Sequence, residues 1–317
     1  MKAELPETLK ADLPPTLLGR IMSSTPVVMT VIATMLAGLA SSEMTKAQYD
    51  RSLAAQQQSK AGDQWSFFQA KRLRSALQHN ALDLLQAANE IHPLDVTVLK
   101  QAIAAISADT AKMAGRLDSA AAQSSLAHLQ EGTLPTVAGV PEVAPAPEIK
   151  AVSAAIEALR PEGEITALLA KVSDSLINES LVAAKKRTDD FDAATKPVNQ
   201  IVEEIDRALQ LPGVAGALHR DFIAARLRLA AARYDTEARL NQSIANLYEL
   251  QVRKNNLSAE RHHGRSQRFF YGMLGAQFAV VVATFAIAAR KRNLLWTLAA
   301  VAGITALLFA AYVYLYI

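Results

Sequence analysis

Long runs without charge divide the chain, and two of them lie close together at its carboxyl end. No charged residue occurs from Phe269 to Ala289 or from Leu294 to Ile317. Each run is as long as the roughly 20 residues that a helix needs to cross about 30 Å of hydrocarbon. A helix on the surface of a soluble protein would carry a polar stripe, and neither run has one. The pattern predicts two transmembrane helices, 269–289 and 294–317, joined by a basic turn at 290–293.

A third apolar run, Ile21 to Ala40, is shorter and contains several serines and threonines. We interpret it as a first transmembrane helix, 21–41, preceded by a mobile arm, 1–20. A cleaved signal peptide is the alternative, because Gly38-Leu39-Ala40 has the small-x-small form of a cleavage site. The charged arm is long for the start of a signal peptide, which favours an uncleaved span.

The pattern of residues 42–268 predicts an extramembrane domain made of helices. In the first helix, 42–91, apolar residues recur at steps of three and four, and His92-Pro93 ends it. These residues are Leu73, Leu77, Ala81, Leu84, Ala88 and Ile91. A last long helix is expected from 214 to 268. Its apolar stripe contains Phe222, Leu229, Leu240, Ile244, Leu247 and Leu250.

Between these two helices the sequence predicts a smaller all-α bundle, 94–210. Breaks are expected at Gly115, at Pro161 to Gly163 and at Pro197, because glycine and proline interrupt helices. A proline-rich linker is expected at 131–148. Since each long helix joins a predicted span at one end, the two must run antiparallel if they pack, as in a coiled-coil-like stalk. The predicted fold class is therefore all-α, an integral membrane protein with three transmembrane helices and a long antiparallel stalk.

Small residues recur within the two closing spans. Gly275, Ala279 and Ala283 follow one another at four-residue steps, and Ala299 and Gly303 do the same in the last span. Small residues on one face allow helix backbones to approach closely in lipid. We therefore expect these five residues to form the packing face of the membrane helices, although the abundance of alanine alone would also produce such spacing.

Basic residues cluster beside the same spans. We expect them to contact lipid headgroups. They are Arg261, Arg265, Arg268, Arg290, Lys291 and Arg292. Positive charge in a short loop favours the cytoplasmic side, so the turn at 290–293 places the domain 42–268 in the periplasm of a bacterial inner-membrane protein. The basic residues before the second span argue for the opposite orientation, but long domains translocate largely regardless of charge.

One run of residues, Asp63-Gln64-Trp65-Ser66-Phe67-Phe68-Gln69-Ala70-Lys71, resembles the signature of a bacterial membrane-protein family called domain of unknown function 4337. Members of that family have a first span, this helix, a charged helical region and a closing hairpin whose basic turn precedes an aromatic residue, here Trp296. The resemblance covers the two ends of the chain, with 94–210 as an enlargement without a counterpart. The resemblance implies the topology of the membrane spans and an oligomeric helical architecture. It implies nothing about an activity, because none is established for the family.

On a helix, four residues in and after this run share one face: Trp65, Phe68, Gln69 and Arg72. Arg72 is expected to stack on Trp65 or Phe68. One interpretation is that this face anchors the first long helix to the last. The other is a patch that binds a partner protein, since tryptophan and arginine are enriched in such patches.

Composition and motifs restrict the chemistry. The net charge is only +3 and there is no cysteine, which argues against nucleic acid as a partner and excludes disulfides and thiolate sites. His262 and His263 are adjacent and point about 100° apart on a helix, so they make a poor metal site. The sequence contains no phosphate-binding loop and no nucleophile elbow. We therefore expect no enzyme activity, no cofactor and no metal.

These observations favour a membrane-anchored helical scaffold or accessory subunit that self-associates or docks on a larger membrane complex. Its expected partners are membrane lipids and either further copies of the chain or the other subunits of such a complex. A helical sensor that binds a ligand is the alternative. A channel is disfavoured, because the spans lack polar residues to line it, and a proton relay or transport pathway is disfavoured, because the spans contain no ionisable residue.

Overall fold

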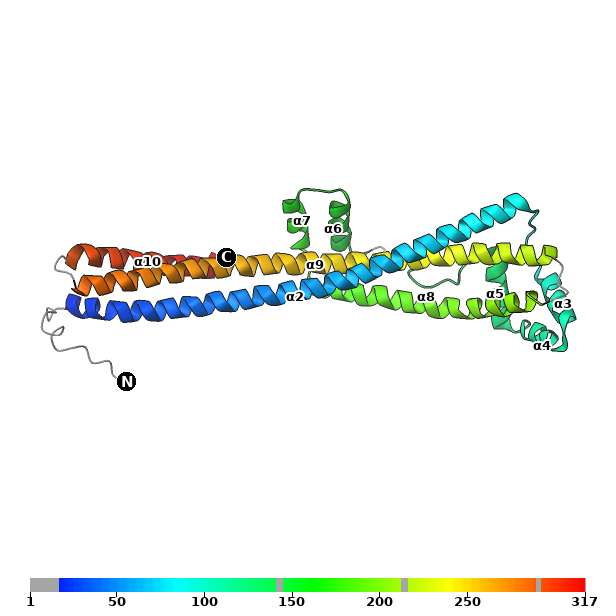
Figure 1. Cartoon of the computed structure of the whole chain (residues 1–317), viewed down its shortest axis with the longest axis horizontal. Helices are drawn as coiled ribbons and strands as arrows, with labels where there is room; N and C mark the ends of the chain where they lie inside the picture. Colours follow the sequence, from blue (N-terminus) through cyan, green and yellow to red (C-terminus); the bar gives the residue numbers. More distant parts are fainter. Residues whose placement is uncertain (1–16, 141–144, 212–215, 289–291, 317) are drawn as a thin grey trace. The chain divides into compact units, whose positions relative to one another are not determined.

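The computed structural model describes residues 17–140, 145–211, 216–288 and 292–316. Within these ranges every regular element is an α-helix and none is a strand, which confirms the predicted all-α class. The helices are labelled in Figure 1. Their bounds are α2 (Leu17–Ala88), α3 (Val96–Ile106), α4 (Ala108–Arg116), α5 (Ala120–Glu131), α6 (Pro147–Glu157), α7 (Glu162–Leu169), α8 (Asp174–Leu209), α9 (Gly216–Ala288) and α10 (Arg292–Tyr316).

The chain divides into two compact units, and α2 and α9 contribute to both. The terminal unit consists of Met1–Ala54 and Asn255–Ile317, and the middle unit consists of Ala55–Lys254. Each unit has buried apolar clusters of its own. We describe the two units separately.

Both long helices are uninterrupted. α2 has 72 residues and α9 has 73. The predicted first span and the helix that follows it are therefore one continuous helix, which passes through Pro26 and through Gly62. α2 ends at Ala88, a few residues before the end expected from His92-Pro93, and the backbone N–H of His92 donates to Asp221 over 2.9 Å.

Two helices in the structure, α2 and α9, are long and apolar enough to cross a membrane by length and composition. They correspond to the first and second predicted spans. In α10, the apolar segment Thr297–Phe309 is shorter than such a span, so the third transmembrane helix stays a prediction. The predicted arm 1–20 lies outside the described residues except for the start of α2, and the turn residues Arg290 and Lys291 lie outside them as well.

The segment from 94 to 131 differs from the sequence-based expectation. It forms α3, α4 and α5 rather than one helix with a break at Gly115, which lies inside α4. The breaks fall where serine side chains cap new helices: Ser107 accepts from the backbone of Thr110, and Ser119 accepts from that of Ala122. Such caps satisfy N–H groups that a helix leaves unpaired at its start.

Proline 197 does not end a helix, so the break predicted there is wrong. α8 runs without interruption from Asp174 to Leu209. A proline in the interior of a helix costs about 3 kcal/mol. Here Phe191, Val198 and Ile205 of α8 are buried on either side of Pro197. This burial outweighs the cost and keeps the helix continuous.

In the middle unit, α9 packs along both α8 and α2. The six stripe residues predicted for α9, from Phe222 to Leu250, are all buried. Phe222 belongs to a core with α3, α4, α5 and α8, and Leu247 belongs to a second core with α6, α7 and α8. The second core also includes Ala61 of α2. α9 is therefore the central helix of this unit.

The face of α2 that contacts α9 is not the one that its apolar periodicity indicates. Ser75 donates to the carbonyl of Ala231 over 3.2 Å, and Leu82 packs on Ala224 and Leu227. With Trp65 bonded to Glu249 farther back along α2, these contacts show that α2 and α9 run antiparallel, as expected. Leu73, Leu77, Ala81, Leu84 and Ala88 are exposed instead.

Candidate functional site

The terminal unit has small residues inside. Of the five residues predicted to form a packing face, Ala279, Ala283 and Ala299 are fully buried. Gly303 is buried as well, and Gly275 is half-buried. A Cβ atom at Gly303 would lie 3.1 Å from the sulfur of Met29, and one at Gly275 would lie 3.5 Å from the Cβ of Ala306. The small residues thus lie where α10 meets α2 and α9.

The outer surface of the terminal unit is made of large apolar side chains. They are more than a third exposed, and they come from all three helices of the unit. They include Val27, Val28, Val31, Met35 and Leu39 of α2, Phe270, Leu274, Phe278, Val281 and Phe285 of α9, and Leu298, Val301, Ile304, Leu307 and Leu308 of α10. A soluble protein rarely exposes apolar surface of this extent.

Beyond the predicted spans, Glu43 of α2 is a buried acidic residue. One of its oxygens lies 2.6 Å from Nδ1 of His262 on α9, and the other accepts from Lys46 over 2.7 Å. Burial acts to raise the pKa of Glu43. The hydrogen bonds and charges of Lys46 and His262 outweigh it, so this pKa lies below its usual 4.5. Nearby, Ser266 donates to the carbonyl of Ala40 over 2.7 Å.

The two adjacent histidines have different partners. His262 pairs with Glu43, whereas a ring nitrogen of His263 lies 3.1 Å from the amide of Gln267. No group of three His, Asp or Glu side chains in the described part of the chain has the arrangement of a metal site.

The basic residues expected at lipid headgroups are placed only in part. Arg261, Arg265 and Arg268 lie on α9, where Arg261 is exposed and the other two are half-buried. Arg292 is the first residue of α10, and its side chain is not described. Their contact with lipid stays a prediction.

In the middle unit, the DQW run of α2 forms bonds to α9. Nε1–H of Trp65 donates to a carboxylate oxygen of Glu249 over 2.7 Å. The Trp65 and Phe68 rings meet edge to face, with their centroids 5.4 Å apart. Arg72 does not stack on either ring as expected, because its guanidinium pairs with Asp235 over 2.7 Å. Gln69 is exposed. Three of the four residues predicted to share a face therefore contact one another or α9.

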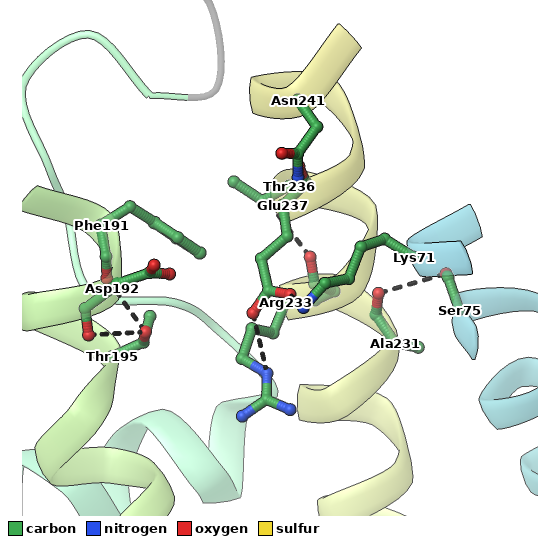
Figure 2. A network of polar contacts seen from close by, with 11 residues as sticks. Lys71, Ser75, Phe191, Asp192, Thr195, Ala231, Arg233, Thr236, Glu237 and Asn241 are labelled. Carbon is green, nitrogen blue, oxygen red and sulfur yellow. Dashed lines mark hydrogen bonds and ion pairs between the residues drawn. The ribbon is translucent and has the colours of Figure 1, made fainter. Parts of the chain in front are cut away.

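Sequence reasoning missed the charged cluster at the centre of this unit. Figure 2 shows Glu237 of α9 between Lys71 of α2 and Arg233 of its own helix. Glu237 pairs with both, at 3.4 Å in the case of Arg233, and its side chain is only 12% exposed. The sequence does contain a sign of this cluster. Lys71 lies three residues after Phe68 and four before Ser75, which places a charged residue in the face of α2 that contacts α9.

Asp192 of α8 lies on the other side of the cluster (Figure 2). Burial raises the pKa of Asp192, and the neighbouring charge of Glu237 adds to the increase, while Lys71 opposes it. The cluster therefore brings charged side chains of α2, α8 and α9 close together, with the ion pair between helices formed by Lys71 of α2 and Glu237 of α9. Charged hydrogen bonds between helices fix register and orientation, which suits a structural junction.

Comparison with known proteins agrees with the resemblance seen in the DQW run. The model of a family described as Domain of unknown function (DUF4337) matches residues 21–196, more than half of the 317 residues of the chain. The match includes Trp65, Phe68 and Lys71. It also continues through 94–196, for which the motif suggested no counterpart, and it stops before the closing hairpin. No curated protein and no solved structure matches the chain. The chain belongs to the DUF4337 family.

Proposed function

We propose that this protein is a membrane-anchored helical scaffold or accessory subunit that self-associates or docks on a larger membrane complex. The terminal unit is its anchor, and the middle unit is the part that holds other molecules. The anchor consists of three spans, 21–41, 269–289 and 294–317. The protein resides in the bacterial inner membrane, with the domain 42–268 in the periplasm.

The observation that carries this proposal is the reversed arrangement of the terminal unit. Ala279, Ala283 and Ala299 fill its interior, while side chains such as Phe278 and Val301 are exposed. In water the larger apolar side chains would be buried first, since each contributes about 1.5–3 kcal/mol when it leaves water. In lipid that drive is absent, and close packing of small residues holds helices together.

The structural role is supported by the contacts between the long helices. Trp65, Lys71 and Arg72 of α2 all pair with carboxylates of α9. Such pairs hold two helices in a fixed register and leave their polar groups engaged with each other rather than with a substrate.

Native mass measurement in mild detergent tests the role. We expect a complex larger than one chain, formed by several copies or by co-purifying subunits. Monomers alone, without a partner, would remove the scaffold proposal even if the protein proved to be an integral membrane protein.

A ligand-binding sensor is the second candidate, favoured by one feature of the middle unit. A cavity of about 460 Å³ lies between α6, α8 and α9, and it has an apolar floor that includes Leu247 and Leu250. Its rim carries Lys150 and Arg187. Cavities of this size accommodate small ligands. Stabilisation of the full chain against heat by one small molecule from a library of anions, lost in R187A, would favour the sensor.

A further inference from the structure

In the middle unit, α2 has a second apolar face that α9 does not cover. We define the α2 stripe as Ala70, Leu73, Leu77, Ala81, Leu84 and Ala88, which follow one another at steps of three and four and are all exposed. The three leucines are 62%, 55% and 71% exposed, in that order. Scattered exposed leucines are normal, but a continuous line of them on one helix marks an interaction surface.

The α2 stripe lies opposite the contact with α9. Ser75 and Leu82 are buried in that contact. Leu84 follows Ser75 by nine residues and Leu82 follows Leu73 by nine, which is about two and a half turns, so each pair points in opposite directions. No adjustment of α9 can therefore cover both faces. A helix that is apolar on two sides is normally buried on two sides.

We propose that the α2 stripe packs against the α2 stripe of a second copy of this chain, with the two helices parallel. The orientation rests on the proposed function: copies that are anchored in one membrane by the same spans leave it in the same direction. The α2 stripe follows the first span within one uninterrupted helix, so it lies at the same position along α2 in both copies. Two-fold symmetry then pairs each residue with its own counterpart.

The chemistry of the α2 stripe suits a parallel pair of equal copies. Asn80 lies in line with the stripe and is exposed. In a parallel pair it meets the other Asn80, and an amide can donate and accept at once. A single asparagine in such a seam specifies register and the number of helices.

The charges that flank the α2 stripe are also compatible with this pairing. Arg74 lies on one flank and Asp83 on the other, and both are exposed. In a parallel pair the two unlike flanks face each other, so neither charge meets its own counterpart across the interface. The flanking alanines Ala76 and Ala87 leave room for close approach.

The extent of the α2 stripe predicts how strong the pairing is. A stable interface buries about 1,000 Å² or more. Ala70 and Ala88 are 18 helical steps apart, or about 27 Å, which places this interface near the lower limit. Confinement of both copies to one membrane raises their effective concentration, so the pairing is expected to be strongest in membranes.

Cysteine crosslinking tests the proposal in the full chain, which has no cysteine of its own. Leu73→Cys and Leu84→Cys are made separately and oxidised with copper phenanthroline in isolated membranes. The exposed positions on the opposite side of α2 provide matched controls, His79→Cys and Gln86→Cys, since each lies nine residues, or about two and a half turns, from a residue of the α2 stripe. We expect a covalent dimer of twice the chain mass for both leucine variants, at least fivefold more abundant than for the controls.

A second variant disrupts the contact between the two α2 stripes without disturbing the fold of the single chain. Leu77 is exposed in the single chain, so Leu77→Lys should keep the helix content and should abolish the dimer in the Leu84→Cys background. Three outcomes would overturn the proposal. They are the absence of dimer at both positions, a crosslinked product of another mass, and crosslinking only when Leu73→Cys and Leu84→Cys chains are mixed, which would indicate an antiparallel pair. If the variants stay in the membrane fraction in any of these cases, the anchor stands and only the pairing fails.

Discussion

Glu43 shows how a single buried charge depends on its partners. It is buried, and its carboxylate pairs with His262 and Lys46. Its pKa in the folded chain is lowered, because these partners outweigh the effect of burial. A carboxyl group with a lowered pKa stabilises the fold when the pH lies above its ordinary pKa. This contribution is lost as the pH falls through the lowered pKa of the folded chain.

We therefore predict that E43Q lowers the free energy of unfolding by about 1 kcal/mol at neutral pH. The loss should shrink below pH 4.5, the ordinary pKa of a glutamate, where the wild-type carboxyl also takes up a proton. Thermal unfolding in detergent at a series of pH values measures this. E260Q is the matched control, since Glu260 is an exposed carboxylate on α9, the helix that carries His262. Equal pH profiles for E43Q and the wild type would contradict the account.

Trp65 supports a second prediction at this scale. Replacing it with phenylalanine keeps most of the ring but removes the N–H that donates to Glu249. We expect W65F to destabilise the fold by about 1–2 kcal/mol, since the acceptor is a charged group. In a double-mutant cycle with E249Q, the combined cost should be smaller than the sum of the single costs. Additive costs would show that the bond contributes nothing.

Among the helices, α9 was predictable and α2 only in part. The predicted stripe of α9, from Phe222 to Leu250, is buried because polar residues surround it and leave only one apolar face. α2 carries leucines on one face and Ala61, Phe68 and Leu82 on another. Periodicity selected the leucines, whereas the contact with α9 uses the second face. Periodicity counts apolar residues, but it does not say which face a given partner covers.

The same limit applies to the candidate site. The DQW run indicated that Trp65, Phe68 and Arg72 share a face, and the structure places them so. Their partners Glu249 and Asp235 could not be predicted, because the register of two antiparallel helices depends on packing along their whole contact. The serine caps of α4 and α5 were readable in hindsight, since Ser107 and Ser119 each precede a helical run.

Proline 197 provides a test at the scale of one helix. The proline lies inside α8, where it removes one backbone hydrogen bond. P197A should restore this bond and stabilise the middle unit by about 1–3 kcal/mol. Circular dichroism during thermal unfolding would show the gain as a higher midpoint. A lower midpoint would mean that the proline fits a bend that α8 requires.

The packing of α10 against α9 can also be tested with a substitution in one helix. Ala299 is fully buried, and its neighbour Ala300 is exposed. We predict that A299L separates α10 from α9 and lowers the midpoint of unfolding in detergent by several degrees, because a leucine overfills a packed interior. A300L should have little effect, since the new side chain points away from the other helices of the unit, toward the proposed lipid-facing surface. A similar response of both variants would argue that this face of α10 is not a helix contact.

At the scale of the whole molecule, the two units have opposite internal compositions. The middle unit buries large side chains such as Phe191 and Phe222, as water-soluble domains do. The terminal unit buries alanines and exposes phenylalanines and leucines. The presence of both arrangements in one chain supports the proposal that water surrounds the middle unit and lipid surrounds the terminal unit.

Extraction of membranes with alkaline carbonate tests this central claim most directly. The treatment releases proteins that are bound only at the surface and leaves those whose helices span the bilayer. The account predicts that the full chain stays in the membrane pellet at high pH and leaves it only when detergent is added. Release into the carbonate supernatant, or a full chain that is soluble without detergent, would contradict it.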